Sequence, residues 1–266
     1  MSERVWVRIP STALNIHSQM PGNVFFLVTC SIIFTKIKGG SMKKLLMKYQ
    51  KIWYALLYVA FYLPCFFFLE NRHVESFHIM HSVLDDKIPF VEIFAIPYYL
   101  WFPFVIVTYF YLAGHDLNSY KKACAFMFIG MTASLIIYYI YPTSQDLRPD
   151  LSTIGRSNIC ITLMKRMYSG DTPTNVNPSL HVYNSIACAI ALWRSNVLKT
   201  AKHANFWRYG AAIMAILISA STFLVKQHSI IDVFWGATFA LFMFIAIYVV
   251  YEKYFEKKSS RQVALD

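Results

Sequence analysis

Apolar segments separated by short polar stretches make up most of the chain from residue 52 onward. Each is close to the roughly 20 residues that a helix needs to cross a bilayer, although the fourth is shorter and is expected to extend a little into its flanks. The pattern predicts an all-α, polytopic membrane protein with a six-helix transmembrane bundle. The expected spans are Ile52–Leu69, Ile93–Ala113, Ala123–Tyr141, Leu180–Trp193, Tyr209–Val225 and Ile231–Tyr251.

The first 41 residues follow a different pattern. Val24–Phe34 is an apolar run of 11 residues, too short to span a bilayer comfortably. Lys38–Gly40 can be encoded by a purine-rich stretch that resembles a bacterial ribosome-binding site, and Met42 with two lysines follows it. We therefore expect translation to begin at Met42, with a poorly cleaved signal segment as the alternative. The expected organisation is an over-called or disordered extension at 1–41, a six-span domain at 42–258 with its core motifs at 141–232, and a short cytoplasmic tail at 259–266.

Composition supports the membrane class. Only 15% of the 266 residues are charged and 57% are hydrophobic, whereas a soluble domain carries about 25% charged residues. The net charge of +11 comes from short basic clusters between the apolar segments, and no RNA- or DNA-binding motif is present. The five cysteines have no CxxC spacing, and four lie in apolar runs, which favours core residues over a disulfide framework or a zinc site. The position of the basic clusters and the lack of a nucleic-acid-binding motif exclude nucleic acid as a partner.

The lysines and arginines predict the orientation. They gather before the first span, after the second, between the fourth and fifth, and after the sixth. If the spans alternate, all these clusters fall on one side, which the positive-inside rule makes cytoplasmic. Both termini are then expected inside a plasma membrane, and the start signal favours a bacterial one.

Two histidines are predicted to meet at the extracytoplasmic face. His181 begins the fourth span from the outer side, and the fifth span returns the chain outward near His228. Asp232 follows His228 by four residues, the spacing that puts two side chains on one helix face. A histidine–carboxylate pair facing a second histidine suits covalent and acid–base catalysis. We expect His228, His181 and Asp232 to be catalytic.

Candidate phosphate ligands surround this pair in the sequence. Arg148 lies in the outer loop 142–178, which is expected to be irregular, and its guanidinium suits a phosphate; a lipid-headgroup contact or a surface ion pair is the alternative. Ser179 is expected to cap a helix whose free N–H groups favour an anion. Lys226 interrupts two apolar segments, either as a phosphate ligand or as an ordinary interfacial lysine.

The outer loop between the first two spans contains a cluster of residue types that bind metals. His78 and His81 are three residues apart and share a helix face, with His73, Asp85 and Asp86 nearby. The sequence lacks a tight histidine-plus-carboxylate signature there, so an interfacial amphipathic segment is favoured. We therefore expect neither a metal nor another cofactor.

At these residues the chain resembles the type 2 phosphatidic acid phosphatase superfamily, over roughly residues 123–251. That family carries a Lys seven residues before Arg-Pro, then Pro-Ser-Gly-His, then Ser-Arg, five residues, His, three residues and Asp. Matches are Arg148-Pro149, Pro178-Ser179-x-His181 and Ser221, His228 and Asp232, while Tyr141, Leu180 and Thr222 replace the family Lys, Gly and Arg. These departures look like the branch with inositol-phosphoceramide-type phosphotransferases and related bacterial lipid phosphatases. Lys226 is the first candidate to replace the missing cations, with Lys165 or Arg166 next.

The resemblance implies a role for each matching residue. His228 would attack phosphorus to form a phosphohistidine, with Asp232 fixing its tautomer, and His181 would protonate the leaving group and then activate water or an acceptor hydroxyl. Arg148 and Ser179 would hold the phosphoryl oxygens. The expected function is metal-independent hydrolysis of a lipid phosphomonoester or diphosphate, with transfer of a phospho-headgroup to a lipid hydroxyl as the alternative. A non-enzymatic transporter or lipid-binding membrane protein is the rival, and it does not require the histidines to be close.

Overall fold

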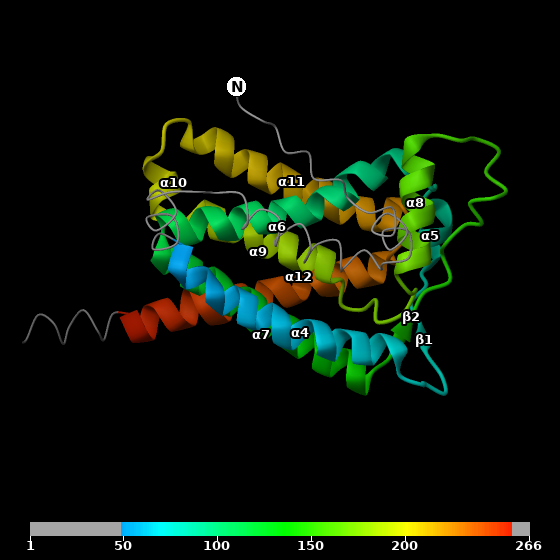
Figure 1. Cartoon of the computed structure of the whole chain (residues 1–266), viewed down its shortest axis with the longest axis horizontal. Helices are drawn as coiled ribbons and strands as arrows, with labels where there is room; N and C mark the ends of the chain where they lie inside the picture. Colours follow the sequence, from blue (N-terminus) through cyan, green and yellow to red (C-terminus); the bar gives the residue numbers. More distant parts are fainter. Residues whose placement is uncertain (1–48, 257–266) are drawn as a thin grey trace, which may run out of the picture. The chain divides into compact units, whose positions relative to one another are not determined.

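The computed structural model describes residues 49–256, so the expectations for residues 1–41 and for the tail at 259–266 lie outside the described residues. The described part is mostly helical, with almost no strand (Figure 1). Its elements are η1 (Gln50–Ile52), α4 (Trp53–Asn71), β1 (His78–Ile79), α5 (Val83–Lys87), η2 (Glu92–Phe94), α6 (Ala95–His115), α7 (Leu117–Ile140), β2 (Thr143–Ser144), α8 (Ile159–Gly170), α9 (Leu180–Arg194), α10 (Asn196–Thr200), α11 (Ala204–Leu224), α12 (Ile230–Phe244) and the π-helical η3 (Ile245–Glu256).

Five helical segments in the described part of the chain are long and apolar enough to cross a membrane. They are α4, η2 with α6, α7, α11, and α12 continued into η3 as far as Val250. Their outer surfaces expose many large apolar side chains, including Ile140, Ile216 and Phe234. Extensive exposed apolar surface is unfavourable in water and is the expected surface toward lipid. These helices fit an integral membrane protein, as the sequence pattern predicts.

The predicted fourth span is a different kind of helix. α9 has 15 residues, about 22 Å at 1.5 Å per residue, which is short of a bilayer core of roughly 30 Å. It packs against α6, α7, α11 and α12, so its neighbours separate it from lipid and it tolerates the buried polar residues Asn184 and Ser185. The expected extension into its flanks is one residue, Arg194, because the residues that bound the helix, Ser179 and Ser195, leave the helical conformation.

Helix α7 begins six residues before the predicted boundary because Asp116 caps it. The Asp116 carboxylate accepts hydrogen bonds from Ser119 N at 3.0 Å and from Ser119 Oγ at 2.8 Å. The same carboxylate accepts from Ser195 Oγ and Asn196 N, each at 2.9 Å. One buried carboxylate therefore joins the start of α7 to the junction of α9 and α10.

The loop 142–178 is not irregular throughout, in contrast to the prediction. It contains the 12-residue helix α8, whose Asn158 cap accepts from Ile161 N at 2.9 Å. Cys160, Met164 and Met167 are buried at helical spacing, which is the sequence signal for this helix. β2 pairs in parallel with β1, and Figure 1 shows α5, α8, β1 and β2 gathered at one end of the long helices. This end carries the candidate site.

Gly236 lets α12 approach the start of α9 closely, which leads to a stability prediction. A Cβ at this position would lie 2.7 Å from Ser179 O and 3.2 Å from Val182 Cβ. Gly236→Ala should therefore cost about 1–3 kcal/mol through overpacking and lower the thermal unfolding midpoint in detergent. Gly210→Ala on α11 is the matched control, because a Cβ there meets no atom within 4 Å. Equal midpoints for the two variants would contradict this packing.

Candidate active site

The two predicted histidines lie together at one end of the helical bundle. His181 is in the first turn of α9, and His228 is in the turn between α11 and α12. Their ring centroids are 5.8 Å apart, although 47 positions separate them in the sequence. Both rings can therefore reach one small group placed between them. This juxtaposition is the central feature of the site.

Asp232 lies close to the His228 ring. His228 Nδ1 is 3.4 Å from Asp232 Oδ2, although the geometry does not complete a hydrogen bond and Nδ1 has no other partner. Asp232 Oδ2 also accepts from Ser229 N at 2.9 Å, which fixes the carboxylate at the start of α12. Catalytic hydrogen bonds are often long in the absence of substrate. The predicted spacing thus brings the pair together even though His228 precedes the helix.

Burial determines the protonation state of His228. The residue is 8% exposed, and burial lowers its pKa to about 3, against the opposing effect of a hydrogen bond with the backbone of Val176. The positive Arg148 lowers this pKa further. His228 is therefore neutral at neutral pH, the form in which an imidazole nitrogen has a free electron pair for nucleophilic attack.

Two aromatic residues of α6 enclose His181. Its ring centroid is 4.5 Å from that of Tyr98 and 4.6 Å from that of Trp101. The Trp101 indole Nε1 is buried and has no hydrogen-bond partner in the structure. These residues carry no motif in the sequence, since aromatic residues three apart are ordinary within an apolar helix. They form an apolar wall beside the proposed acid–base group, with one unused donor.

Arg148 lies near the pair, but the terminal nitrogens of its guanidinium are already engaged. Nη1 donates to Asp171 O at 2.8 Å, and Nη2 donates to Thr172 O at 3.2 Å and to Gln227 Oε1 at 2.7 Å. Its plane lies over the Tyr168 ring, with Cζ 4.8 Å from the centroid. Only Nε is buried without a partner. These contacts join Arg148 to the end of the loop and to Gln227. They occupy the two nitrogens that a bidentate contact with a phosphate would need.

Gln227 is a polar residue of the site to which the sequence pattern assigns no role. It directly precedes His228, is 3% exposed, and holds Arg148 through Oε1. Its Nε2 is a buried donor with no partner. Buried amide donors are almost always hydrogen-bonded in native proteins, so an unused donor here points to an acceptor that binds at this site. The sequence signal for Gln227 is its place in the polar stretch 226–228, which separates two apolar segments.

Ser179 occupies the N-cap position of α9 but does not cap it through its side chain. Its N donates to Asp232 O at 3.2 Å, while Oγ is fully buried and unpartnered. The preceding Pro178 O accepts from Tyr138 Oη of α7 at 2.7 Å. The start of α9 is thus held between α7 and α12, with a hydroxyl and the first-turn N–H groups left for an anion.

The predicted replacement cations lie elsewhere. Lys226 donates from Nζ to Asp85 O at 2.6 Å, so it contacts backbone where a phosphate ligand was expected. Lys165 and Arg166 are on the exposed face of α8. Tyr141, at the family Lys position, is partly exposed and stacks on His78 with ring centroids 4.0 Å apart. Thr222 stays within the backbone network, where its carbonyl accepts from Gln227 N and His228 N.

In the first outer loop, His81 contacts one aspartate of its own loop and one of the loop 142–178. His81 Nδ1 lies 2.9 Å from Asp146 Oδ1, and His81 Nε2 lies 2.8 Å from Asp86 Oδ1. Within residues 49–256, no group of three or more metal-ligating side chains is placed to hold an ion.

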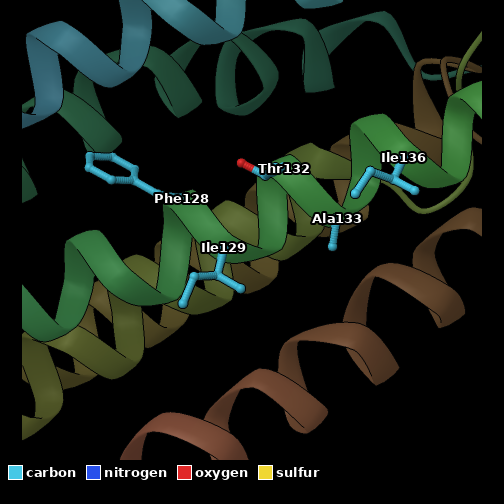
Figure 2. A pocket seen from close by; sticks show the side chains of 5 residues that line it. All are labelled: Phe128, Ile129, Thr132, Ala133 and Ile136. Atoms are coloured by element: carbon cyan, nitrogen blue, oxygen red, sulfur yellow. The ribbon is translucent and has the colours of Figure 1, made fainter.

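An apolar pocket of about 360 Å³ lies along α7, away from the histidine pair. Figure 2 shows its lining residues projecting from this one helix: Phe128, Ile129, Thr132, Ala133 and Ile136. Tyr58 of α4 stacks on Phe128 at 4.0 Å and bonds Thr132 Oγ1 at 3.1 Å. The lining offers no titratable side chain, so this surface suits contact with lipid chains and is no candidate for chemistry.

The fold and the site together define a class: a helical protein, with features of an integral membrane protein, that holds a pair of histidines at one end of its helical bundle. Comparison with protein-family models, with curated proteins and with solved structures finds no match to this chain. The functional argument therefore depends on the residues themselves.

Proposed function

We propose that this protein is a membrane enzyme that cleaves a lipid phosphate ester through a phosphohistidine at His228. The observation that carries the proposal is the arrangement around this neutral ring, with Asp232 3.4 Å from Nδ1 and the His181 ring 5.8 Å away. A nucleophile flanked by an orienting carboxylate and a second titratable group is the arrangement that covalent catalysis needs. The six-span topology and an extracytoplasmic site belong to the same proposal, as does the resemblance in sequence motifs.

The first chemical step forms an N–P bond. His181 acts from its protonated form, which the negative charge of the bound phosphate favours. His228 Nε2 attacks phosphorus as the bond to the leaving lipid oxygen breaks, and the His181 imidazolium donates a proton to that oxygen and becomes neutral. Asp232 accepts the Nδ1 proton of His228 in a hydrogen bond and balances the positive charge that develops on the ring. In the second step His181 takes a proton from water, which attacks phosphorus and releases phosphate. His228 is restored in its neutral form.

The phosphoryl oxygens would be held by two neutral side-chain donors and one nitrogen of a guanidinium. Ser179 Oγ, Gln227 Nε2 and Arg148 Nε are buried and unpartnered, and the Ser179 side chain does not cap the first turn of α9. Donors fixed before the substrate arrives stabilise developing charge without reorganisation. The rival transporter reading needs no such juxtaposition of histidines and donors, so the geometry supports an enzyme.

The test is to incubate the purified protein in mixed micelles with phosphorus-labelled lipids and to identify the products. Phosphatidate and a polyprenyl diphosphate are the substrates for hydrolysis, and we expect labelled inorganic phosphate from at least one of them. If neither these lipids nor a labelled phosphodiester lipid releases any labelled product, the proposal fails.

Transfer of a phospho-headgroup is the second candidate, and one observation favours it. The cations beside the pair are already committed, Arg148 to carbonyls and Gln227, and Lys226 to Asp85 O. Neutral donors suit a phosphodiester monoanion better than a phosphomonoester dianion, because buried charge must be compensated. Adding a lipid alcohol to the same assay distinguishes the two reactions, since transfer gives a new labelled lipid in place of free phosphate.

A further inference from the structure

Asp85 is a buried carboxylate that the chemistry above does not use. It lies in α5, in the segment between α4 and α6, and is 1% exposed. Oδ1 accepts from Ile230 N at 2.9 Å, and Oδ2 accepts from Ser229 Oγ at 2.6 Å and from Ser82 N at 2.8 Å. Two of these three donors belong to the first residues of α12. A residue about 145 positions away in sequence thus holds the start of that helix.

Lys226 makes the reciprocal contact. Its Nζ donates to Asp85 O at 2.6 Å, so the two residues join their segments in both directions. Lys226 has φ 55°, in the left-handed region that residues other than glycine rarely adopt. Such a conformation persists when the surrounding contacts fix it, and it is often found at functional sites. Val91 N donates to Leu224 O at 2.9 Å and fixes the other side of the same turn.

Two hydrogen bonds and one close contact lead from Asp85 to the proposed nucleophile. Asp85 holds Ser229 through Oγ, and Ser229 N donates to Asp232 Oδ2 at 2.9 Å. That same oxygen lies 3.4 Å from His228 Nδ1. The position of the imidazole therefore depends on where the segment 82–91 holds the turn 225–230.

We propose that Asp85, together with Lys226, is a positioning residue that fixes the turn 225–230 and so aims His228 between Asp232 and the substrate. Its kinetic consequence rests on the proposed function, whereas its effect on the His228 ring does not. Asp85 acts through Ser229 and Asp232 and contacts no reacting atom.

The experiment compares Asp85→Asn with Asp86→Asn in the full-length protein in detergent. Asparagine has the size of aspartate, but an NH2 group replaces one of the two carboxylate oxygens. That NH2 group would face an N–H or O–H donor and could not accept its hydrogen bond. Asp86 is the neighbouring carboxylate, its side chain is 63% exposed, and it bonds only to His81 among the contacts described. Ring-nitrogen NMR of histidine-labelled protein, with His228 assigned by its loss in His228→Asn, reports ring position and tautomer independently of activity.

Asp85→Asn is expected to shift or split the His228 ring signals. It should also lower kcat at least about tenfold and leave KM within about twofold of wild type. The reason is that misplacing a reacting group by about 1 Å lowers the rate by up to about 100-fold. Asp86→Asn should leave both unchanged. Unaltered His228 signals in a folded Asp85→Asn protein would overturn the proposal. If the wild-type protein shows no phosphate-ester cleavage, the proposed function fails while the NMR result still decides the role of Asp85.

Lys226→Gly provides a second route if Asp85→Asn does not fold. Glycine adopts φ 55° without strain but removes the ammonium contact with Asp85. We expect the His228 signals to broaden or shift in this variant as well. A folded Lys226→Gly protein with wild-type signals and wild-type kcat would overturn the proposal.

Discussion

Replacing His228 with asparagine is expected to reduce cleavage of a lipid phosphate ester by at least about 1,000-fold, because it removes the nucleophile itself. Asparagine is smaller than histidine and polar, so it can occupy the buried turn, but its amide nitrogen has no electron pair suited to attack on phosphorus. Burial keeps the native ring neutral, with a pKa of about 3, so no proton has to leave before it reacts at neutral pH.

The measurement for this variant is initial-rate release of labelled product from the best wild-type substrate. His73→Asn is the matched control, because His73 is exposed and outside the site. We expect the control to stay within about twofold of wild type. Full activity in a folded His228→Asn protein would exclude the covalent scheme.

Replacing His181 with asparagine has the second largest expected effect, and the effect should depend on the leaving group. General acid–base catalysis contributes about 100- to 10,000-fold, so turnover of a lipid ester with a poor leaving alcohol should fall by that amount. A p-nitrophenyl ester needs little protonation of its leaving oxygen, so His228 should still attack it. The second step would remain slow, because water would lack its base.

The measurement is a pre-steady-state assay of the His181→Asn protein with p-nitrophenyl phosphate. We expect a burst of nitrophenol of about one equivalent per enzyme, followed by slow turnover. Equal losses for the lipid ester and the p-nitrophenyl ester, with no burst, would show that His181 does not act as acid and base. The position of His181 in the first turn of α9, facing His228, leads to this expectation.

Local sequence signals predicted several parts of the site well. Pro178 and Ser179 predicted a helix that begins at Leu180, and α9 begins there. The four-residue spacing from His228 to Asp232 predicted proximity, and the contact is present at 3.4 Å. Hydrophobic length predicted the long helices. These features depend on a few neighbouring residues, so a pattern along the chain is sufficient to find them.

Other features depend on partners distant in the sequence, and the sequence pattern did not reveal them. The sequence predicts Arg148 as a phosphate ligand, with a lipid-headgroup contact or a surface ion pair as the alternative, but Nη1 and Nη2 bind carbonyls of the segment after α8 and Gln227. Lys226 was predicted beside the phosphate, but a backbone carbonyl holds it. Asp85 was considered only for a metal or an interfacial segment. Each outcome depends on which loops meet at the end of the bundle, and charge spacing along the chain does not carry that information.

The predicted family resemblance remains a prediction, since no comparison with known proteins matches the chain. The geometry and the motifs nevertheless favour the same two histidines. The shortage of uncommitted cations near them is the main departure from the predicted phosphate site. Neutral donors such as Gln227 Nε2 take that place in the proposed mechanism.

The most direct test of the central claim is to locate the covalent intermediate. The His181→Asn protein, in which the second step is slow, is mixed with phosphorus-labelled substrate, quenched at alkaline pH where phosphohistidine survives, digested and analysed by mass spectrometry. The account predicts close to one label per chain on the peptide that contains His228, and no label in the double variant that also carries His228→Asn. Product release with the label on another residue, or with no labelled peptide at any time in the reaction, would contradict it.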